Sequence, residues 1–295
     1  MQKLVLGTAQ FGMKYGLDNN NIFRSKSIVN RVLKEARKNK IYYLDTALSY
    51  GDAQKKIGLL DKNKKFKIIT KIDKIGKINN SKIKNYLKVK ISQILKDLRR
   101  ECIDVLLIHN FSDLKKNKKS LLKALSEFKK KKLIKKIGIS VYTPDQAIYS
   151  LELSEIKFLQ IPFNILDQRW LNEKFLSSLE KRQDVEIQAR SIFLRGLILS
   201  KYKKWPKKII NSKDMISKID KIIKKTNTRN KLELSTSYIR SFKWINYITF
   251  GINSLNQFRQ VIKYSKGKKL NFIEKKLINN SFKDLNEKIL IPTNW

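Results

Sequence analysis

The sequence predicts an α/β fold, a single (β/α)8 TIM barrel with a C-terminal helix. Three observations support this prediction. Short segments rich in Ile and Val alternate with helical patterns along the 295 residues, as in a parallel sheet covered by helices. Eight such segments occur, and a barrel of eight strands needs about 250 residues. Polar residues follow several of these segments, where a barrel has its active site. We therefore expect residues 1–295 to form one domain.

The predicted strands are short apolar runs bounded by polar residues, as expected for strands buried on both faces. They are Lys3–Leu6, Tyr42–Leu44, Lys67–Thr70, Val105–Ile108, Lys136–Ile139, Phe158–Ile161, Val185–Ala189 and Tyr247–Phe250. Apolar residues at helical spacing predict helices between them. These are Ser27–Lys38, Ser81–Arg99, Ser120–Lys131 and Pro144–Leu153, followed near the end by Phe272–Leu285 and a tail, Leu290–Trp295.

The composition bounds the partners of the chain. Its 66 basic and 25 acidic residues give a net charge of +41, a field that attracts polyanions. Most of the basic residues are lysines spread over successive helices, and no nucleic-acid-binding module is present. We interpret the charge as compositional drift and expect no specific nucleic-acid partner. The lone Cys102 suits a reducing compartment. Without a signal pattern or a long apolar run, we expect a cytoplasmic protein with no membrane partner.

Four polar residues carry the candidate chemistry. Asp45 and Tyr50 follow the second predicted strand, Lys71 follows the third and His109 follows the fourth. The carboxyl ends of neighbouring parallel strands lie together, so we expect these side chains to converge. Each residue alone has an ordinary structural interpretation, although His109 is the only histidine. Together they can polarise and protonate a carbonyl oxygen without a metal ion.

The motifs around these residues resemble the aldo/keto reductase family from Leu4 to about Gln260. The segment DTALSYG is similar to the family signature D-T-A-x-x-Y-G, and it falls between other matching motifs in family order. The matching motifs are LGTAQFGMKYG (Leu6–Gly16), DTALSYG (Asp45–Gly51), TK (Thr70, Lys71), LLIHN (Leu106–Asn110), KKIGISVY (Lys135–Tyr142), LQIPFNILDQR (Leu159–Arg169), ARSIFLRGLIL (Ala189–Leu199) and FGINSLNQ (Phe250–Gln257).

The resemblance implies roles for the four residues. Tyr50 is implied as the general acid, Lys71 and Asp45 as its electrostatic partners, and His109 as the group that orients the carbonyl. A free phenol has a pKa near 10 and is a weak acid. We expect the ammonium of Lys71 to lower that pKa, while Asp45 holds the ammonium in place.

The resemblance also implies a nicotinamide cofactor across the barrel mouth, since no G-x-G-x-x-G fingerprint of a Rossmann domain occurs. NADP(H) is favoured by family habit, with NAD(H) as the alternative. Implied contacts to the carboxamide are Ser140 and Gln160, to the pyrophosphate Ser191, Phe193, Gly196 and Leu197, and to the adenosine phosphate end Gly251, Ser254 and Gln257. The stretch Lys201–Thr228 is implied as a loop over the cofactor followed by a helix.

Three departures from the family pattern stand out. Val141 follows Ser140 where many members have Asn. Gly251 and Gln257 stand where a basic pair often grips a 2′-phosphate. Arg190 replaces an aromatic ring that stacks on nicotinamide in many members. A guanidinium can stack too, or it can meet an anionic substrate. We favour stacking and keep the second role open.

The leading hypothesis is an NAD(P)H-dependent oxidoreductase that reduces an aldehyde, a ketone or a sugar carbonyl. A sugar derivative is one candidate substrate, and the opening motif is similar to that of bacterial family members. The alternative is a cofactor-binding redox sensor that acts through a protein partner with little turnover. A polyanion-binding protein is a third hypothesis and rests on charge alone. The presence of all four residues favours the enzyme hypothesis over the sensor hypothesis. The sequence predicts no particular oligomeric state.

Overall fold

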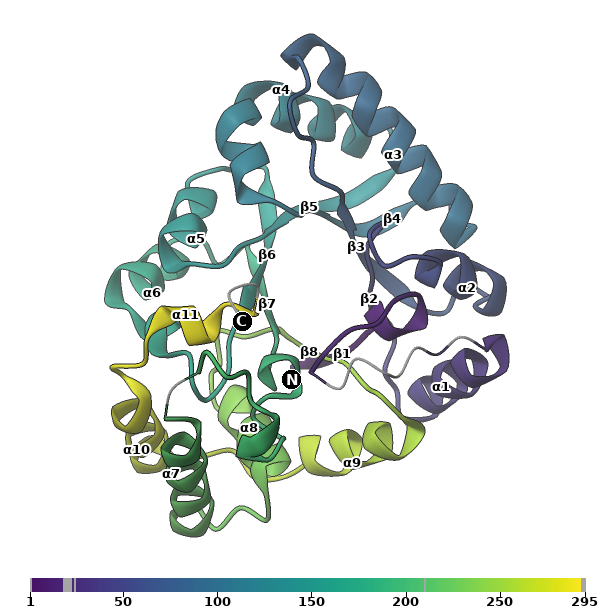
Figure 1. Cartoon of the computed structure of the whole chain (residues 1–295). Helices are drawn as coiled ribbons and strands as arrows, with labels where there is room; N and C mark the ends of the chain where they lie inside the picture. Colours follow the sequence, from purple (N-terminus) through teal and green to yellow (C-terminus); the bar gives the residue numbers. More distant parts are fainter. Residues whose placement is uncertain (1, 18–22, 24, 210, 293–295) are drawn as a thin grey trace.

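The computed structural model describes residues 2–17, 23, 25–209 and 211–292, so Thr293–Trp295 of the predicted tail lie outside the described residues. Eight parallel strands close into a barrel in chain order (Figure 1). The fold prediction is thereby confirmed. The strands are β1 (Lys3–Gly7), β2 (Tyr43–Asp45), β3 (Lys67–Ile72), β4 (Ile103–Ile108), β5 (Ile134–Ser140), β6 (Ile156–Pro162), β7 (Glu186–Arg190) and β8 (Tyr247–Phe250).

All eight predicted strands are present, with their ends moved by at most two residues. The strands β4, β5 and β6 begin earlier than predicted because polar residues near their starts interrupt the apolar runs. Two of these, Asp104 and Lys135, form an ion pair with each other at 2.8 Å on adjacent strands. Lys157 of β6 pairs with Asp184. A prediction based on apolar runs alone therefore places the first residues of these strands too late in the sequence.

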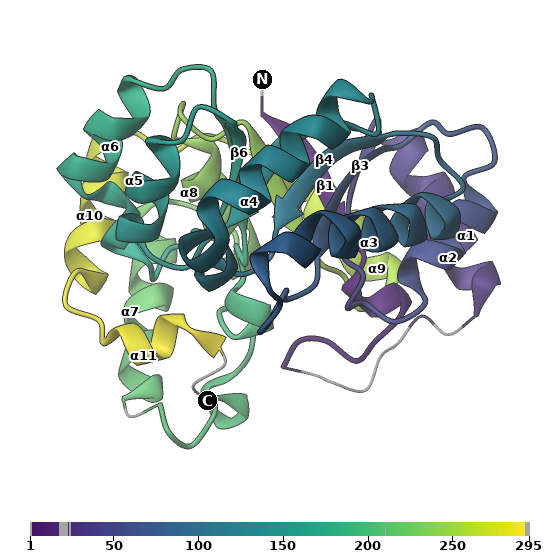
Figure 2. The same cartoon turned by 90° about the horizontal axis from the view of Figure 1, so that it is seen from above.

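Helices surround the barrel on all sides (Figures 1 and 2). They are α1 (Lys26–Lys38), α2 (Ala53–Leu60), α3 (Ile83–Leu98), α4 (Phe111–Lys130), α5 (Pro144–Leu151), α6 (Glu173–Glu180), α7 (Ser212–Lys225), α8 (Lys231–Arg240), α9 (Leu255–Ser265), α10 (Phe272–Phe282) and α11 (Glu287–Leu290). No helix of the described residues is long and apolar enough to cross a membrane.

The largest error of the helix prediction concerns α4, which begins at Phe111 and not at Ser120. The lysine-rich start of this helix gives little apolar signal, yet Leu114 is fully buried beneath it. The helix bends at Asn117, whose backbone has a φ of −119°. At the other end of the chain, α10 stops three residues before the predicted Leu285. The stretch Lys201–Thr228 forms a loop and then α7, as predicted.

The barrel interior is layered because inward-facing residues recur at every second position of a strand. The lower layer is apolar and consists of Val5, Ile69, Val105, Leu107, Phe158 and Tyr247. Nearer the carboxyl ends of the strands lie the polar side chains of Asp45, Lys71, Gln160, Gln188 and Thr249, all buried. The strand period therefore builds a polar floor at the carboxyl end of the barrel.

Candidate active site

An ion pair at the carboxyl end of the barrel forms the centre of the site. The ammonium of Lys71 on β3 contacts the carboxylate of Asp45 on β2, and the two residues are only 2% and 4% exposed. The Lys71 Nζ also donates to the Thr46 carbonyl at 3.1 Å and to the Tyr50 hydroxyl at 3.4 Å. Three of the four residues singled out in the sequence therefore meet through hydrogen bonds.

Two glutamines hold the other oxygen of the Asp45 carboxylate. Gln188 Nε2 donates to Asp45 Oδ2 at 2.9 Å, and Gln160 Nε2 donates to the same atom and, at 3.0 Å, to Gln188 Oε1. Ser140 Oγ donates to Gln160 Oε1 at 3.1 Å. The carboxylate is thus satisfied on both oxygens. A buried charge with all its acceptors used is fixed in position.

Sequence reasoning missed Gln188 and Thr249, which are hydrogen-bonded to each other within this floor. Both lie inside strands that read as ordinary apolar runs. The signal that could have found Gln188 is its register opposite Gln160 on the neighbouring strand. Polar side chains at matched inward positions of adjacent barrel strands indicate a shared network.

Tyr50 is positioned by a turn that packs against the loop after β1. A Cβ atom added at Gly12 would overlap the carbonyl oxygen of Tyr50 and the backbone of residues 52 and 53. Gly51 has a φ of +56°, and a Cβ there would overlap the Gly12 carbonyl. Two glycines therefore let the backbones touch, and this contact sets the height of the phenol in the mouth.

The electrostatics of Tyr50 differ from the expectation. Burial raises the pKa of Tyr50 well above its ordinary value, and the negative charge of Asp45 adds to this, while the Arg190 guanidinium opposes it. The prediction that Lys71 lowers the pKa of Tyr50 is therefore wrong in direction. The ammonium is paired with Asp45, and desolvation of a phenolate is the larger effect. Tyr50 therefore keeps its proton at neutral pH, as a proton donor must.

His109, the fourth residue, follows β4 and is half-buried beside this cluster. Burial, together with the positive charges of Lys71 and Arg190, lowers its pKa from 6.5 to about 4. The imidazole is therefore neutral at pH 7, and it makes no hydrogen bond with any residue that the structure describes. A neutral ring with a free N–H can donate to a substrate oxygen.

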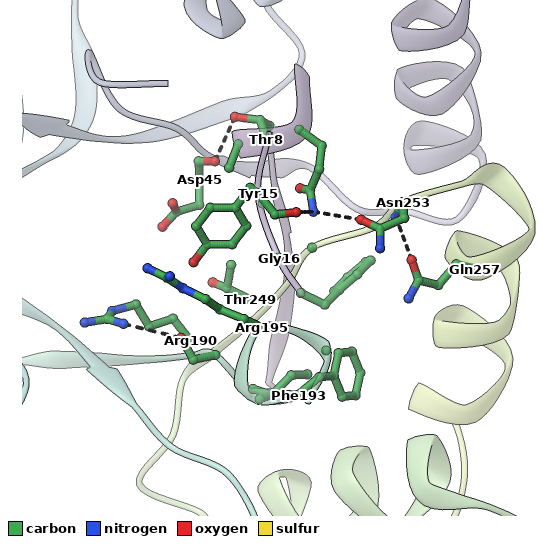
Figure 3. Close-up of a pocket in the computed structure, with 18 of the residues that line it drawn as sticks. Thr8, Tyr15, Gly16, Asp45, Arg190, Phe193, Arg195, Thr249, Asn253 and Gln257 are labelled. Atoms are coloured by element: carbon green, nitrogen blue, oxygen red, sulfur yellow. Dashed lines mark hydrogen bonds between the residues drawn. The ribbon is translucent and has the colours of Figure 1, made fainter. Parts of the chain in front are cut away.

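A pocket opens above the polar floor and runs toward the start of α9 (Figure 3). Many of the residues implied by the family resemblance line it, namely Asp45, Tyr50, Gln160, Arg190, Ser191, Phe193, Gly196, Gly251 and Gln257. Lys71 and Ser140 lie in the floor beneath, and Leu197 is buried behind the wall. Ser254 caps α9 by accepting the Gln257 N–H at 3.1 Å. The structure therefore gathers most of the predicted site residues around one pocket.

Arg190, at the end of β7, lies over the ring of Tyr142. Its guanidinium carbon is 4.4 Å from the centroid of the Tyr142 ring. Its nitrogens donate to Ser191 Oγ and to the Val141 carbonyl, each at 3.3 Å. It forms no ion pair with a described residue, so its charge is free to act on a bound molecule.

The pocket also has walls that the sequence analysis did not identify. In Figure 3, Tyr15 and Arg195 lie between Asp45 on one side and the start of α9 on the other. The Arg195 guanidinium stacks on the Tyr15 ring at 5.1 Å, and the Arg195 carbonyl accepts the Leu17 N–H at 3.0 Å. The loop after β1 and the loop after β7 therefore meet at the rim.

The α9 end of the pocket carries backbone and amide donors. Gln10 Nε2 donates to Asn253 Oδ1 at 3.1 Å, and the Asn253 N–H donates to Gln257 Oε1 at 2.6 Å. The N–H groups of the first turn of α9 that Ser254 does not cap suit a phosphate, as does Arg195, which forms no ion pair with a described residue. An elongated pocket with a neutral proton donor at one end and anion-binding groups further along fits a nicotinamide dinucleotide.

Comparisons with known proteins agree with this geometry. The chain matches the model of the aldo/keto reductase family over residues 3–277. An uncharacterized oxidoreductase, YqkF, of Bacillus subtilis (strain 168) is 26% identical over 211 residues, which are 68% of either chain.

Solved structures show the same fold. The holo form of aldo-keto reductase AKR11C1 from Bacillus halodurans has a TM-score of 0.75 at 21% identity, with 94% of this chain and 91% of that chain covered. A putative aldo-keto reductase from Pseudomonas aeruginosa has a TM-score of 0.65 at 17% identity, with coverage of 89% and 88%.

Proposed function

Because the chain belongs to the aldo/keto reductase family and is an NAD(P)-dependent oxidoreductase acting on carbonyl compounds, we propose that Tyr50 is the proton donor of this reaction. The observation that carries the proposal is the Tyr50 hydroxyl, 3.4 Å from the Lys71 Nζ at the bottom of the pocket. Asp45 in turn holds that ammonium. The proposed substrate is an aldehyde, a ketone or a sugar carbonyl.

Four residues of the chain have separate roles in the proposed reduction. The bound nicotinamide supplies the hydride. Tyr50 donates its proton as negative charge develops on the carbonyl oxygen. Lys71 stabilises the phenolate that this leaves, and Asp45 keeps Lys71 at that position. His109, neutral at pH 7 because its pKa is about 4, donates a hydrogen bond that orients the carbonyl.

The cofactor residues carried over from the family belong to the same proposal. Gln160 and Ser140 stand near the nicotinamide end, the loop after β7 at the pyrophosphate and the start of α9 at the adenosine. Gln160 Nε2 donates to Asp45 and Gln188. Its Oε1, which already accepts the Ser140 hydroxyl, is therefore the atom that can accept a carboxamide N–H. Stacking of Arg190 on the nicotinamide fits its guanidinium, which already lies over the Tyr142 ring.

The test is a panel of neutral and anionic aldehydes, ketones and sugars, assayed with NADPH and with NADH. Reduction of a carbonyl compound that disappears in Tyr50→Phe supports the proposal. The alternative, a redox sensor, predicts tight cofactor binding with negligible turnover on every member of the panel. The enzyme hypothesis is favoured by the contacts among Tyr50, Lys71 and Asp45, since a sensor does not need a proton donor.

A further inference from the structure

A second cavity continues the pocket beyond its adenosine end. Leu199 and Gln257 line both hollows. The second one lies between the end of α7, the start of α8 and the outer face of α9. Its cations are Lys224, Arg229 and Lys231, against one carboxylate, Asp220. A molecule that fills the first pocket to Gln257 therefore meets a positively charged cleft next.

Lys231 differs from the many surface lysines of this chain. It is half-buried, and its Nζ has one hydrogen bond with a described residue, to the Ser200 carbonyl at 3.3 Å. Burial lowers the pKa of Lys231, with Asp220 opposing the shift. No described carboxylate lies within ion-pair distance of its ammonium. A partly desolvated ammonium without a counter-charge is unfavourable, and a bound anion would relieve it.

The two neighbouring cations are also available. Arg229 is 68% exposed and touches Glu233 only through its Nε, at 4.0 Å. The same Glu233 oxygen already accepts the Arg229 backbone N–H at 2.7 Å. Lys224, in the last turn of α7, forms no ion pair with a described residue. Their terminal nitrogens are free to approach an anion beside Lys231.

This cleft lies near the part of the cofactor in which NADP(H) and NAD(H) differ. NADP(H) differs from NAD(H) by one phosphate on the adenosine ribose. Gly251 and Gln257 occupy the positions where many family members have a basic pair for that phosphate, so neither position supplies a cation for it. We propose that Lys231, with Arg229 and Lys224 beside it, binds the 2′-phosphate and makes the enzyme selective for NADP(H). The inference rests on the proposed function, which places the adenosine at Gln257.

The test measures binding and not turnover. Titration calorimetry gives Kd for NADPH, NADH, 2′,5′-ADP and 5′-AMP with the wild type, Lys231→Gln and Lys231→Arg. We expect the wild type to bind the two phosphate-bearing ligands more tightly. Loss of a charge-assisted hydrogen bond in Lys231→Gln should weaken both by about ten- to a hundred-fold and leave NADH and 5′-AMP within about twofold. Lys231→Arg should retain most of the selectivity.

Lys225→Gln is the matched control, because Lys225 is exposed on α7 and does not line the cleft. It removes the same charge and should change no Kd beyond about twofold. Equal binding of NADPH and NADH by the wild type overturns the inference alone, as does an equal loss for all four ligands in Lys231→Gln. Absence of binding by every nucleotide would overturn the proposed function as well.

Discussion

Replacement of Tyr50 by Phe is the sharpest perturbation of the proposed chemistry, because it removes one oxygen atom and keeps the ring. Among the described residues, the hydroxyl has a single hydrogen bond, with the Lys71 Nζ at 3.4 Å. The ring also keeps its contact with the ammonium, which lies 5.0 Å from the ring centroid. We therefore expect the free energy of unfolding to change by less than about 1 kcal/mol and the Kd of the cofactor to stay within a few fold.

The loss of activity should be large by comparison. A positioned proton donor contributes about 10²–10⁴-fold, or about 3–5 kcal/mol of barrier. No other group in the described site can replace it easily. Lys71 is held by Asp45, and His109 is neutral at pH 7 because its pKa is about 4. We expect kcat to fall by two orders of magnitude or more.

The assay follows oxidation of the reduced cofactor with the best substrate of the panel, alongside calorimetry for cofactor binding. Tyr142→Phe is the control, since Tyr142 is a second tyrosine of this region, stacked under Arg190. Its hydroxyl has no role in the proposed chemistry, so this variant should keep most of the activity. If Tyr50→Phe retained most of its activity with normal cofactor binding, the proton donor would be another group.

Four further outcomes follow from the structure. Lys71→Met should lower kcat about as much as Tyr50→Phe and should destabilise the fold by about 3–5 kcal/mol in urea unfolding, because the buried Asp45 carboxylate loses its cation; unchanged stability would contradict a stabilising role of this buried ion pair. Arg190→Tyr should affect neutral and anionic substrates alike if the guanidinium stacks on the nicotinamide, whereas a selective rise of KM for anionic substrates, worth about 2–5 kcal/mol for a lost charge pair, would show that stacking is the wrong role. The His109 pKa falls from 6.5 to about 4 on folding, so protonation favours the unfolded chain; stability should drop by about 2 kcal/mol between pH 6.5 and 4, and His109→Asn should show less of this drop in urea titrations at both pH values. Binding to DNA should be weak, independent of sequence and lost steeply with salt, and a sequence-specific complex at physiological salt would refute compositional drift.

The sequence predicted the barrel well because buried parallel strands leave a strong local signal. The ends of β2 and β3 placed Asp45 and Lys71 correctly, since the strand period and the barrel topology together decide which side chains point inward. Gln188 escaped notice because its contact with Asp45 joins residues 143 positions apart. The direction of the Tyr50 pKa shift was also beyond the sequence, because it depends on how deeply a three-dimensional site is desolvated.

The contact between the two loops at the rim has a kinetic consequence. The Leu17 N–H to Arg195 carbonyl bond and the stack of Arg195 on Tyr15 bridge one side of the pocket. Passage of a dinucleotide through that side requires both contacts to part, at a cost of about 1–3 kcal/mol. We expect these contacts to slow cofactor exchange through that side by roughly ten- to a hundred-fold.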